Sequence, residues 1–90
     1  MDISRLDLWT LIICGVRYAM RRRSYMPSLV CEIFRRHSEH LTGQQVRQIR
    51  DEVAEGLRVD AEHPGYMGSP CDVDEWRRLV AWIDSERPNA

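Results

Sequence analysis

Arginines and tyrosines gather in the first third of the sequence, in the stretch CGVRYAMRRRSYM that begins at Cys14. Arg21, Arg22 and Arg23 are consecutive, and Tyr25 follows them closely. Guanidinium groups form paired hydrogen bonds with phosphates or carboxylates, and aromatic rings stack on nucleic-acid bases. The stretch therefore predicts a partner-binding or phosphate-binding patch. The alternative interpretation needs no partner, because arginines at this position also complement the dipole at the end of a helix.

Acidic residues flank a loop-like segment in the second half of the sequence. Residues 59–71, VDAEHPGYMGSPC, contain two prolines and two glycines and predict the longest loop of the chain. The carboxylates around it are Asp60, Glu62, Asp72, Asp74 and Glu75. Carboxylates at this density can take the place of phosphates and occupy a basic, nucleic-acid-binding groove of a partner protein. The alternative is that they form ordinary solvated helix faces.

The histidines and cysteines match no metal-binding or catalytic signature. His37 and His40 lie on one predicted helix face, and Cys31, His63 and Cys71 are the other candidate ligands, but their spacing fits no zinc pattern. No cysteine stands beside a base that would activate it, and no glycine-rich phosphate loop is present. We therefore predict a protein that is not an enzyme and needs no metal or cofactor.

Composition and length indicate one small globular domain. The chain has 90 residues, of which 43% are hydrophobic and 30% charged, so residues 1–90 are predicted to form a single domain. Its longest apolar run, LWTLIICGV, is well short of the ~20 residues that cross a membrane, and no secretory signal is evident. An odd number of cysteines, three, is typical of reduced thiols. The predicted compartment is the cytoplasm of the cell in which the protein acts.

Charge is distributed unevenly along the chain. Residues 1–50 hold nine arginines and four acidic residues, whereas residues 51–90 hold four arginines and ten acidic residues. The formal net charge of the whole chain is only -1. Folding decides whether these two halves mix or remain separate on the surface.

Two helices are predicted in the first half. The first spans residues 4–21 behind a Ser4–Asp7 capping box, and its broad apolar surface predicts that it is the central, most buried helix. The second begins at Pro27, a favourable first helical residue, and runs to about residue 40.

Two further helices are predicted in the second half. One spans residues 43–57, begins with a Thr42–Gln45 capping box and ends near Gly56. The other spans residues 72–85 and is capped by Asp72 with Glu75, with Trp82 expected to be exposed. The predicted fold is an all-α, compact bundle of about four helices with one longer loop near residues 59–71.

A helix-turn-helix is one functional alternative. It would be built from helices 27–40 and 43–57, joined at HLTGQQ, with the second helix reading DNA bases. The side chains suited to base edges are Gln44, Gln45, Arg47, Gln48 and Arg50. Asp51, Glu52 and Glu55 on the same helix weaken this hypothesis, because carboxylates repel phosphates.

A resemblance points to a different function. The run VRYAMRRRSYM resembles an Arg-Tyr-Ala-x-x-Arg-x-Ser/Thr-Tyr motif of small phage and prophage accessory proteins, in which the motif likewise follows a helix containing a tryptophan. The resemblance covers Trp9 to about Ile33 and departs at Arg21, where those proteins have glycine. It implies a non-enzymatic, mobile-element interaction protein with a host protein complex as its partner. The leading class is the anti-CRISPR inhibitors, which bind RNA-guided surveillance complexes and obstruct target DNA.

Overall fold

The computed structural model describes residues 5–22 and 27–90, with side chains for residues 8–20 and 27–90, and this part forms helices without any strand. The elements are α1 (Arg5–Arg22), α2 (Pro27–His37), a 3-10 helix η1 (Ser38–His40), α3 (Gly43–Glu62) and α4 (Pro70–Glu86). The predicted all-α bundle is therefore confirmed. None of the helices in the described part is both long and apolar enough to cross a bilayer.

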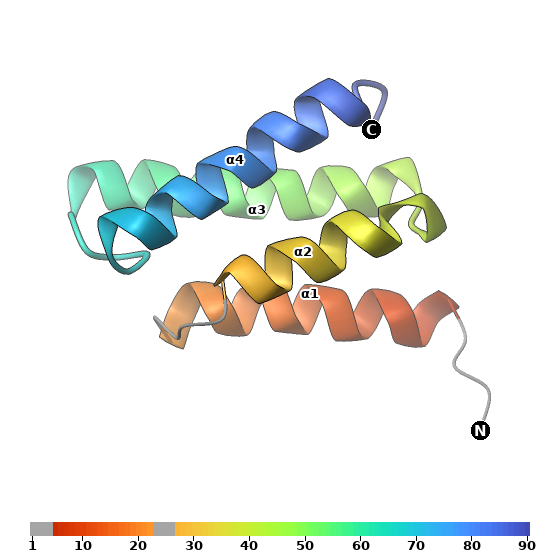
Figure 1. Cartoon of the computed structure of the whole chain (residues 1–90), viewed down its shortest axis with the longest axis horizontal. Coiled ribbons are helices and arrows are strands. Elements are labelled where there is room, and N and C mark those ends of the chain that lie inside the picture. The colour runs from red at the N-terminus through yellow and green to blue at the C-terminus, as the bar shows by residue number, and fades with distance from the viewer. Residues whose placement is uncertain (1–4, 23–26) are drawn as a thin grey trace.

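The four α-helices form a closed ring of neighbours in two layers. α1 packs against α2 and α3, and α4 packs against the same two helices. Figure 1 shows α2 and α4 in the layer nearer the viewer and α1 and α3 behind them. The Cα extents of 40 × 29 × 16 Å agree with two helical layers. The hairpins α1–α2 and α3–α4 thus lie side by side, each with one helix in each layer.

Local signals account for most helix starts. Pro27 is the first residue of α2, as predicted. At the start of α3 the Gln45 backbone N–H donates to Thr42 Oγ1 at 3.1 Å, and the Thr42 N–H donates to Gln45 Oε1 at 3.0 Å. This reciprocal arrangement is the predicted capping box. The predicted Ser4–Asp7 box includes a residue outside the described part of the chain.

The longest loop is shorter than predicted, because both flanking helices extend into it. α3 does not end near Gly56 but continues to Glu62, helped by an Arg58–Glu62 ion pair of 3.0 Å one turn apart. α4 starts at Pro70 and is capped by Ser69, with Asp72 as the partner in its capping box. The predicted cap at Asp72 with Glu75 is therefore wrong by one turn. The loop comprises residues 63–69.

Gly56 has a packing role and does not end the helix. A side chain there would bring its first carbon within 2.8 Å of both Met20 Cε and Met67 Sδ. Glycine therefore lets α1 and the loop after α3 approach this face of α3. The left-handed backbone that a turn requires occurs later, at Gly65 (φ 96°) and Gly68 (φ 107°).

The core lies between the layers, and α1 is not its central helix. α1 contributes Ile12, Ile13, Val16 and Ala19, but its outer face is open and Leu11 is 64% exposed. The prediction that α1 is the most buried helix is wrong, because each helix in a ring of four has an outer face. The prediction that Trp82 is exposed is also wrong. Trp82 packs against the core, edge-on to Phe34 with ring centroids 6.1 Å apart. The largest fully buried side chains are Trp76, Phe34, Ile49, Met67, Leu79 and Ile83.

Candidate partner-binding surfaces

The uneven charge of the sequence becomes a spatial separation. α1 and α2 together hold six arginines and two acidic residues, whereas α3 and α4 hold five arginines and ten acidic residues. Because the two hairpins lie side by side, the basic and acidic halves of the chain form opposite halves of the molecule (Figure 1). Within the described part of the chain, ion pairs cross the boundary from arginines of the basic hairpin: Arg17 to Glu52 at 2.8 Å and Arg35 to Glu75 at 3.9 Å.

Two of the predicted acidic site residues have structural roles. Asp60 Oδ1 accepts the backbone N–H of Met67 at 2.9 Å and so holds the loop 63–69 against α3. Asp72 Oδ2 accepts the Ser69 N–H at 3.0 Å in the capping box of α4. Their carboxylates are used within the fold, so the structure does not offer them as primary contacts for a partner.

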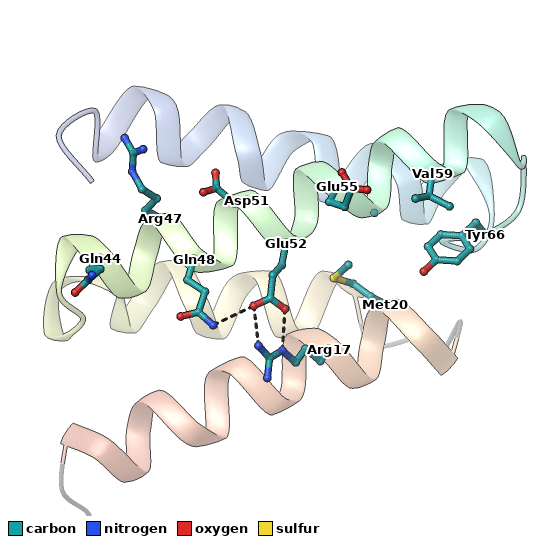
Figure 2. A pocket seen from close by; sticks show the side chains of 11 residues that line it. Arg17, Met20, Gln44, Arg47, Gln48, Asp51, Glu52, Glu55, Val59 and Tyr66 are labelled. Carbon is teal, nitrogen blue, oxygen red and sulfur yellow. Dashed lines mark hydrogen bonds and ion pairs between the residues drawn. The ribbon is translucent and has the colours of Figure 1, made fainter.

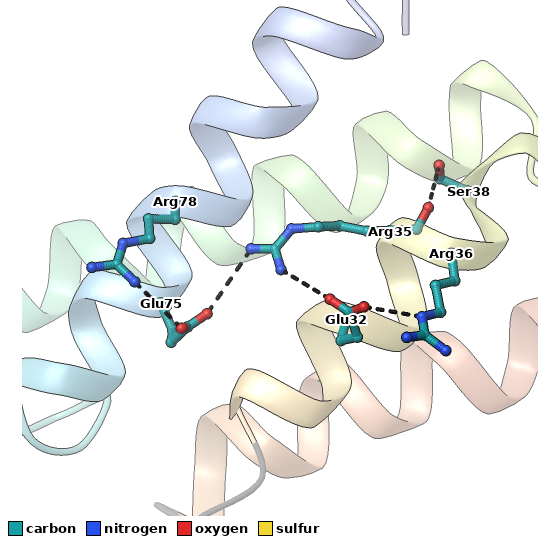
Figure 3. A network of polar contacts seen from close by, with 6 residues as sticks. All are labelled: Glu32, Arg35, Arg36, Ser38, Glu75 and Arg78. Carbon is teal, nitrogen blue, oxygen red and sulfur yellow. Dashed lines mark hydrogen bonds and ion pairs between the residues drawn. The ribbon is translucent and has the colours of Figure 1, made fainter.

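Glu75 belongs to a chain of ion pairs between α2 and α4 (Figure 3). Its carboxylate lies 3.9 Å from Arg35 and 3.5 Å from Arg78, and Arg35 also lies 3.7 Å from Glu32. The network continues from Glu32 to Arg36 at 2.9 Å. With only 27% of its side chain exposed, Glu75 mainly joins the two helices of the front layer.

The remaining two acidic site residues face solvent. Glu62 is 61% exposed and Asp74 59% exposed, and among the side chains that the structure describes their ion pairs are with an arginine on their own helix, at 3.0 Å and 3.9 Å respectively. Asp74 also borders a groove of about 310 Å³ between the starts of α2 and α4. Its other lining residues are Pro27, Ser28, Cys71, Asp72, Glu75 and Arg78. Of the predicted acidic set, Glu62 and Asp74 are best placed to meet a partner.

The predicted arginine patch lies mostly outside the described residues. The side chains of Arg21 and Arg22, and the whole of Arg23 and Tyr25, are not part of the described structure. The end of α1 and the start of α2 do lie at the same end of the bundle as the loop 63–69 (Figure 1). The predicted acidic region and the described ends of the two helices next to the arginine patch therefore lie at one end of the molecule.

A larger groove that the sequence did not reveal runs along α3. It has a volume of about 590 Å³ and lies between α1, α3 and the loop 63–69. Figure 2 shows Arg17 reaching across it to Glu52 in a two-pronged contact, with Nε–Oε1 and Nη2–Oε2 both at 2.8 Å. Met20 and Tyr66 line one end, and the polar start of α3 lines the other. The one feature of the sequence that could have indicated this groove was Gly56, because a glycine inside a helix favours close approach of neighbouring groups.

The candidate DNA-reading side chains of α3 are largely engaged within the chain. Gln45 belongs to the capping box, Gln48 donates to Glu52 at 3.2 Å, and Arg47 donates to the Ala90 carbonyl at 2.9 Å. Arg50 donates to both carboxylate oxygens of Asp84 on α4, at 2.7 and 3.1 Å. These bonds lower the pKa of the Asp84 carboxyl group, which keeps it ionised beside the proposed recognition helix. The remaining member of the set, Gln44, lines the groove along α3.

The cysteines and histidines were the candidate metal ligands and nucleophiles of the sequence. No group of three or more His, Cys, Asp or Glu side chains there is arranged to hold a metal ion. All three cysteines are free thiols, with Cys14 and Cys71 exposed and Cys31 fully buried. Burial raises the pKa of Cys31 to about 12, so this thiol stays protonated and unreactive at neutral pH.

Thiol labelling should separate the cysteines. In native protein at neutral pH, an aromatic disulfide reagent should react quickly with Cys14 and Cys71, and Cys31 should react only after denaturant is added. The absorbance of the released thiolate counts the groups, and Cys31→Ser is the matched control that should remove only the slow phase. Rapid reaction of Cys31 in native protein would contradict its position in the core.

Comparisons with protein-family models, curated proteins and solved structures found no match to this chain. The arguments about function therefore rest on the sequence and on the geometry described above.

Proposed function

We propose that this protein is a non-enzymatic interaction protein whose acidic α3–α4 half occupies a basic, nucleic-acid-binding surface of a partner protein complex. The observation that carries this proposal is the separation of charge, with ten acidic residues on α3 and α4 against five arginines. Many of these carboxylates are exposed, including Glu62, Asp74 and Asp51. Exposed carboxylates on rigid helices attract arginine and lysine side chains in the way that phosphates do, and they accelerate association with a basic surface.

The partner that fits best is an RNA-guided surveillance complex. Such a complex guides DNA through a positively charged channel, and an acidic helical bundle is a suitable competitor for that channel. The resemblance around Arg17–Tyr25 to phage accessory proteins supports the same choice. The protein would then act as an anti-CRISPR inhibitor in the cytoplasm of the host cell.

Direct DNA binding is the alternative function. It would require α3 to approach a duplex, and the bonds of Arg47 and Arg50 to groups within the chain leave few donors for DNA. Asp51, Glu52 and Glu55 on α3 would repel the phosphates. The geometry favours the inhibitor for these reasons.

Reversing two exposed charges should weaken partner binding. Glu62→Arg with Asp74→Arg removes two exposed carboxylates without touching the capping box of α4 or the Asp60 contact. We expect at least about a tenfold rise in Kd, equivalent to about 1.4 kcal/mol, measured by biolayer interferometry on a panel of purified RNA-guided surveillance complexes. The effect should shrink as salt increases, because salt screens exposed charges.

A matched control separates this surface from general charge effects. Glu39→Arg makes the same change at an exposed residue of η1, remote from the loop 63–69, and should leave Kd unchanged. Loss of binding in Arg21→Glu with Arg22→Glu, but not in Glu62→Arg with Asp74→Arg, would assign the contact to the basic end instead. Failure to bind any complex in the panel, together with sequence-selective binding to duplex DNA at about 0.15 M salt, would replace the inhibitor with a DNA-binding regulator.

A further inference from the structure

The outer face of α1 carries a row of apolar side chains at a spacing that suits another helix. Leu8, Leu11, Gly15 and Tyr18 are separated by three, four and three residues, so they lie on one seam along α1. Leu11 is 64% and Tyr18 58% exposed, whereas Gly15 is half-buried and Leu8 packs partly against the core. This alternation of three and four residues is the pattern with which helices pair in coiled coils.

The seam borders an apolar groove between α1 and α2. The groove has a volume of about 250 Å³ and is lined by Leu8, Leu11 and Gly15 of the seam together with Val30 and Ile33 of α2. Of the five large apolar residues that are exposed in the described part of the chain, four lie on α1 and α2: Leu11, Tyr18, Leu29 and Ile33. Apolar surface that is concentrated in this way marks an interaction site.

Gly15 makes the seam self-complementary. Glycine in the middle of a helix costs about 1 kcal/mol relative to alanine, so its presence there needs a reason. Packing within the described chain does not supply one, because a side-chain carbon at Gly15 would meet nothing within 4 Å. The glycine leaves a hollow one turn after the protruding Leu11. A single helix therefore presents both a protruding side chain and a hollow.

We propose that this seam is the contact between two copies of the chain, with α1 packed antiparallel against α1 of the second copy. In this arrangement Leu11 of each copy fills the hollow at Gly15 of the other, and Leu8 packs against Tyr18. The charges favour the same orientation. Arg17, Arg21 and Arg22 lie in the second half of α1, whereas the charges of Arg5 and Asp7 in the first half cancel. Antiparallel helices therefore set each arginine group against a segment without net charge, and parallel helices would bring the two arginine groups together.

The size of the contact predicts a weak dimer. The 18 residues of α1 span about 27 Å and the 11 residues of the adjacent α2 about 16 Å, each helix presenting a face about 10 Å wide. Together these faces bury roughly 900 Å² in total over the two copies, the size of a weak, transient interface. The dimer should therefore form in a concentration-dependent way, and it leaves the acidic α3–α4 half of each copy exposed.

Sedimentation equilibrium over a range of concentrations tests the proposal. Wild-type protein should pass from monomer to dimer as concentration rises, and Leu11→Glu should raise the dimer Kd at least about 100-fold because it buries a charge in the seam. Leu11 is exposed in the monomer, so circular dichroism and the melting temperature of the variant should stay near wild type. Tyr66→Glu, which places the same charge at an exposed aromatic residue of the loop 63–69, should dimerise like wild type.

Two further variants test the geometry. Gly15→Ala adds a side-chain carbon that meets nothing within 4 Å in the monomer but narrows the hollow for Leu11 of the second copy, so it should fold normally and dimerise more weakly than wild type. Cys14 lies beside the seam near its midpoint, so antiparallel pairing places the two Cys14 thiols close together on the same side. In Cys71→Ser protein, a short bis-maleimide should therefore link the copies, and Leu11→Glu should abolish that link.

Three outcomes would contradict the proposed dimer or its geometry. A wild-type chain that remains monomeric at its highest soluble concentration, or a Leu11→Glu variant that still dimerises, overturns the proposal. A dimer that Leu11→Glu abolishes but that Cys14 does not crosslink overturns the antiparallel arrangement.

Discussion

Trp76→Ala should lower the free energy of unfolding by about 3–5 kcal/mol, the cost of removing a large aromatic side chain from a packed core. Trp76 is fully buried and is the largest of the core side chains. It extends from α4 into the space between the two layers, where all four helices contribute buried residues. Alanine would leave a cavity among these buried side chains. Urea unfolding followed by circular dichroism measures the change.

Two control substitutions test this explanation. Trp76→Phe keeps most of the apolar volume and removes the indole Nε1–H, a donor with no acceptor among the described residues, so it should cost much less than Trp76→Ala. Tyr66→Ala removes a half-exposed ring from the loop and should change stability by no more than about 0.5 kcal/mol. A loss below about 1 kcal/mol for Trp76→Ala would mean that the core is not built around this residue.

Arg87→Ala should cost about 2 kcal/mol, a large effect for an arginine near the surface. Its guanidinium donates from Nη1 to the Ser38 carbonyl at 2.7 Å and from Nη2 to the Leu41 carbonyl at 3.3 Å. Both residues are buried; Ser38 begins η1, and Leu41 follows η1 where the chain turns towards α3. Arg87 therefore fastens the end of α4 to the connection between α2 and α3. Without it, the Leu41 carbonyl loses this charged donor.

The matched control is Arg36→Ala. Arg36 is an arginine of similar size whose ion pair of 2.9 Å goes to Glu32 on its own helix, and its side chain is 72% exposed. Exposed ion pairs of this kind contribute about 0.3–0.5 kcal/mol, so Arg36→Ala should be nearly neutral in the same unfolding experiment. Equal effects of the two substitutions would show that the Arg87 bonds do not hold α4 in place. Arg87→Lys should lie between, because an ammonium group cannot reach both carbonyls with the geometry of a guanidinium fork.

Helix type and number were predictable because they depend on local signals. The start of α2 at Pro27 and the capping box of Thr42 with Gln45 use groups within a single turn, and both are confirmed. The ends of helices were harder to predict. Gly56 suggested a helix end. Its actual role is to leave room for Met20 and Met67, which come from other parts of the chain and pack against it. A glycine in a sequence does not reveal whether its backbone must turn or its neighbours must approach.

The candidate site was predicted in kind but not in detail. The sequence identified five carboxylates around the loop, and folding gave them different roles. Asp60 and Asp72 hold backbone groups, Glu75 joins α2 to α4, and Glu62 and Asp74 remain exposed. The groove along α3 could not be predicted, because the partners of its central ion pair, Arg17 and Glu52, are 35 residues apart in sequence.

By itself, the sequence determined that this protein is all-α, that α2 begins at Pro27 and α3 at the Thr42–Gln45 capping box, and that its two halves carry opposite charge. Each of these properties follows from residues close together in the chain. Only the tertiary structure decided that the two charged halves remain apart in space, since this depends on which helices pack together. The same packing buried one stripe of α1 and left Leu11 and Gly15 on its outer face. A helix with apolar residues all round does not specify which side faces the core, because that choice is made by the neighbours that cover it.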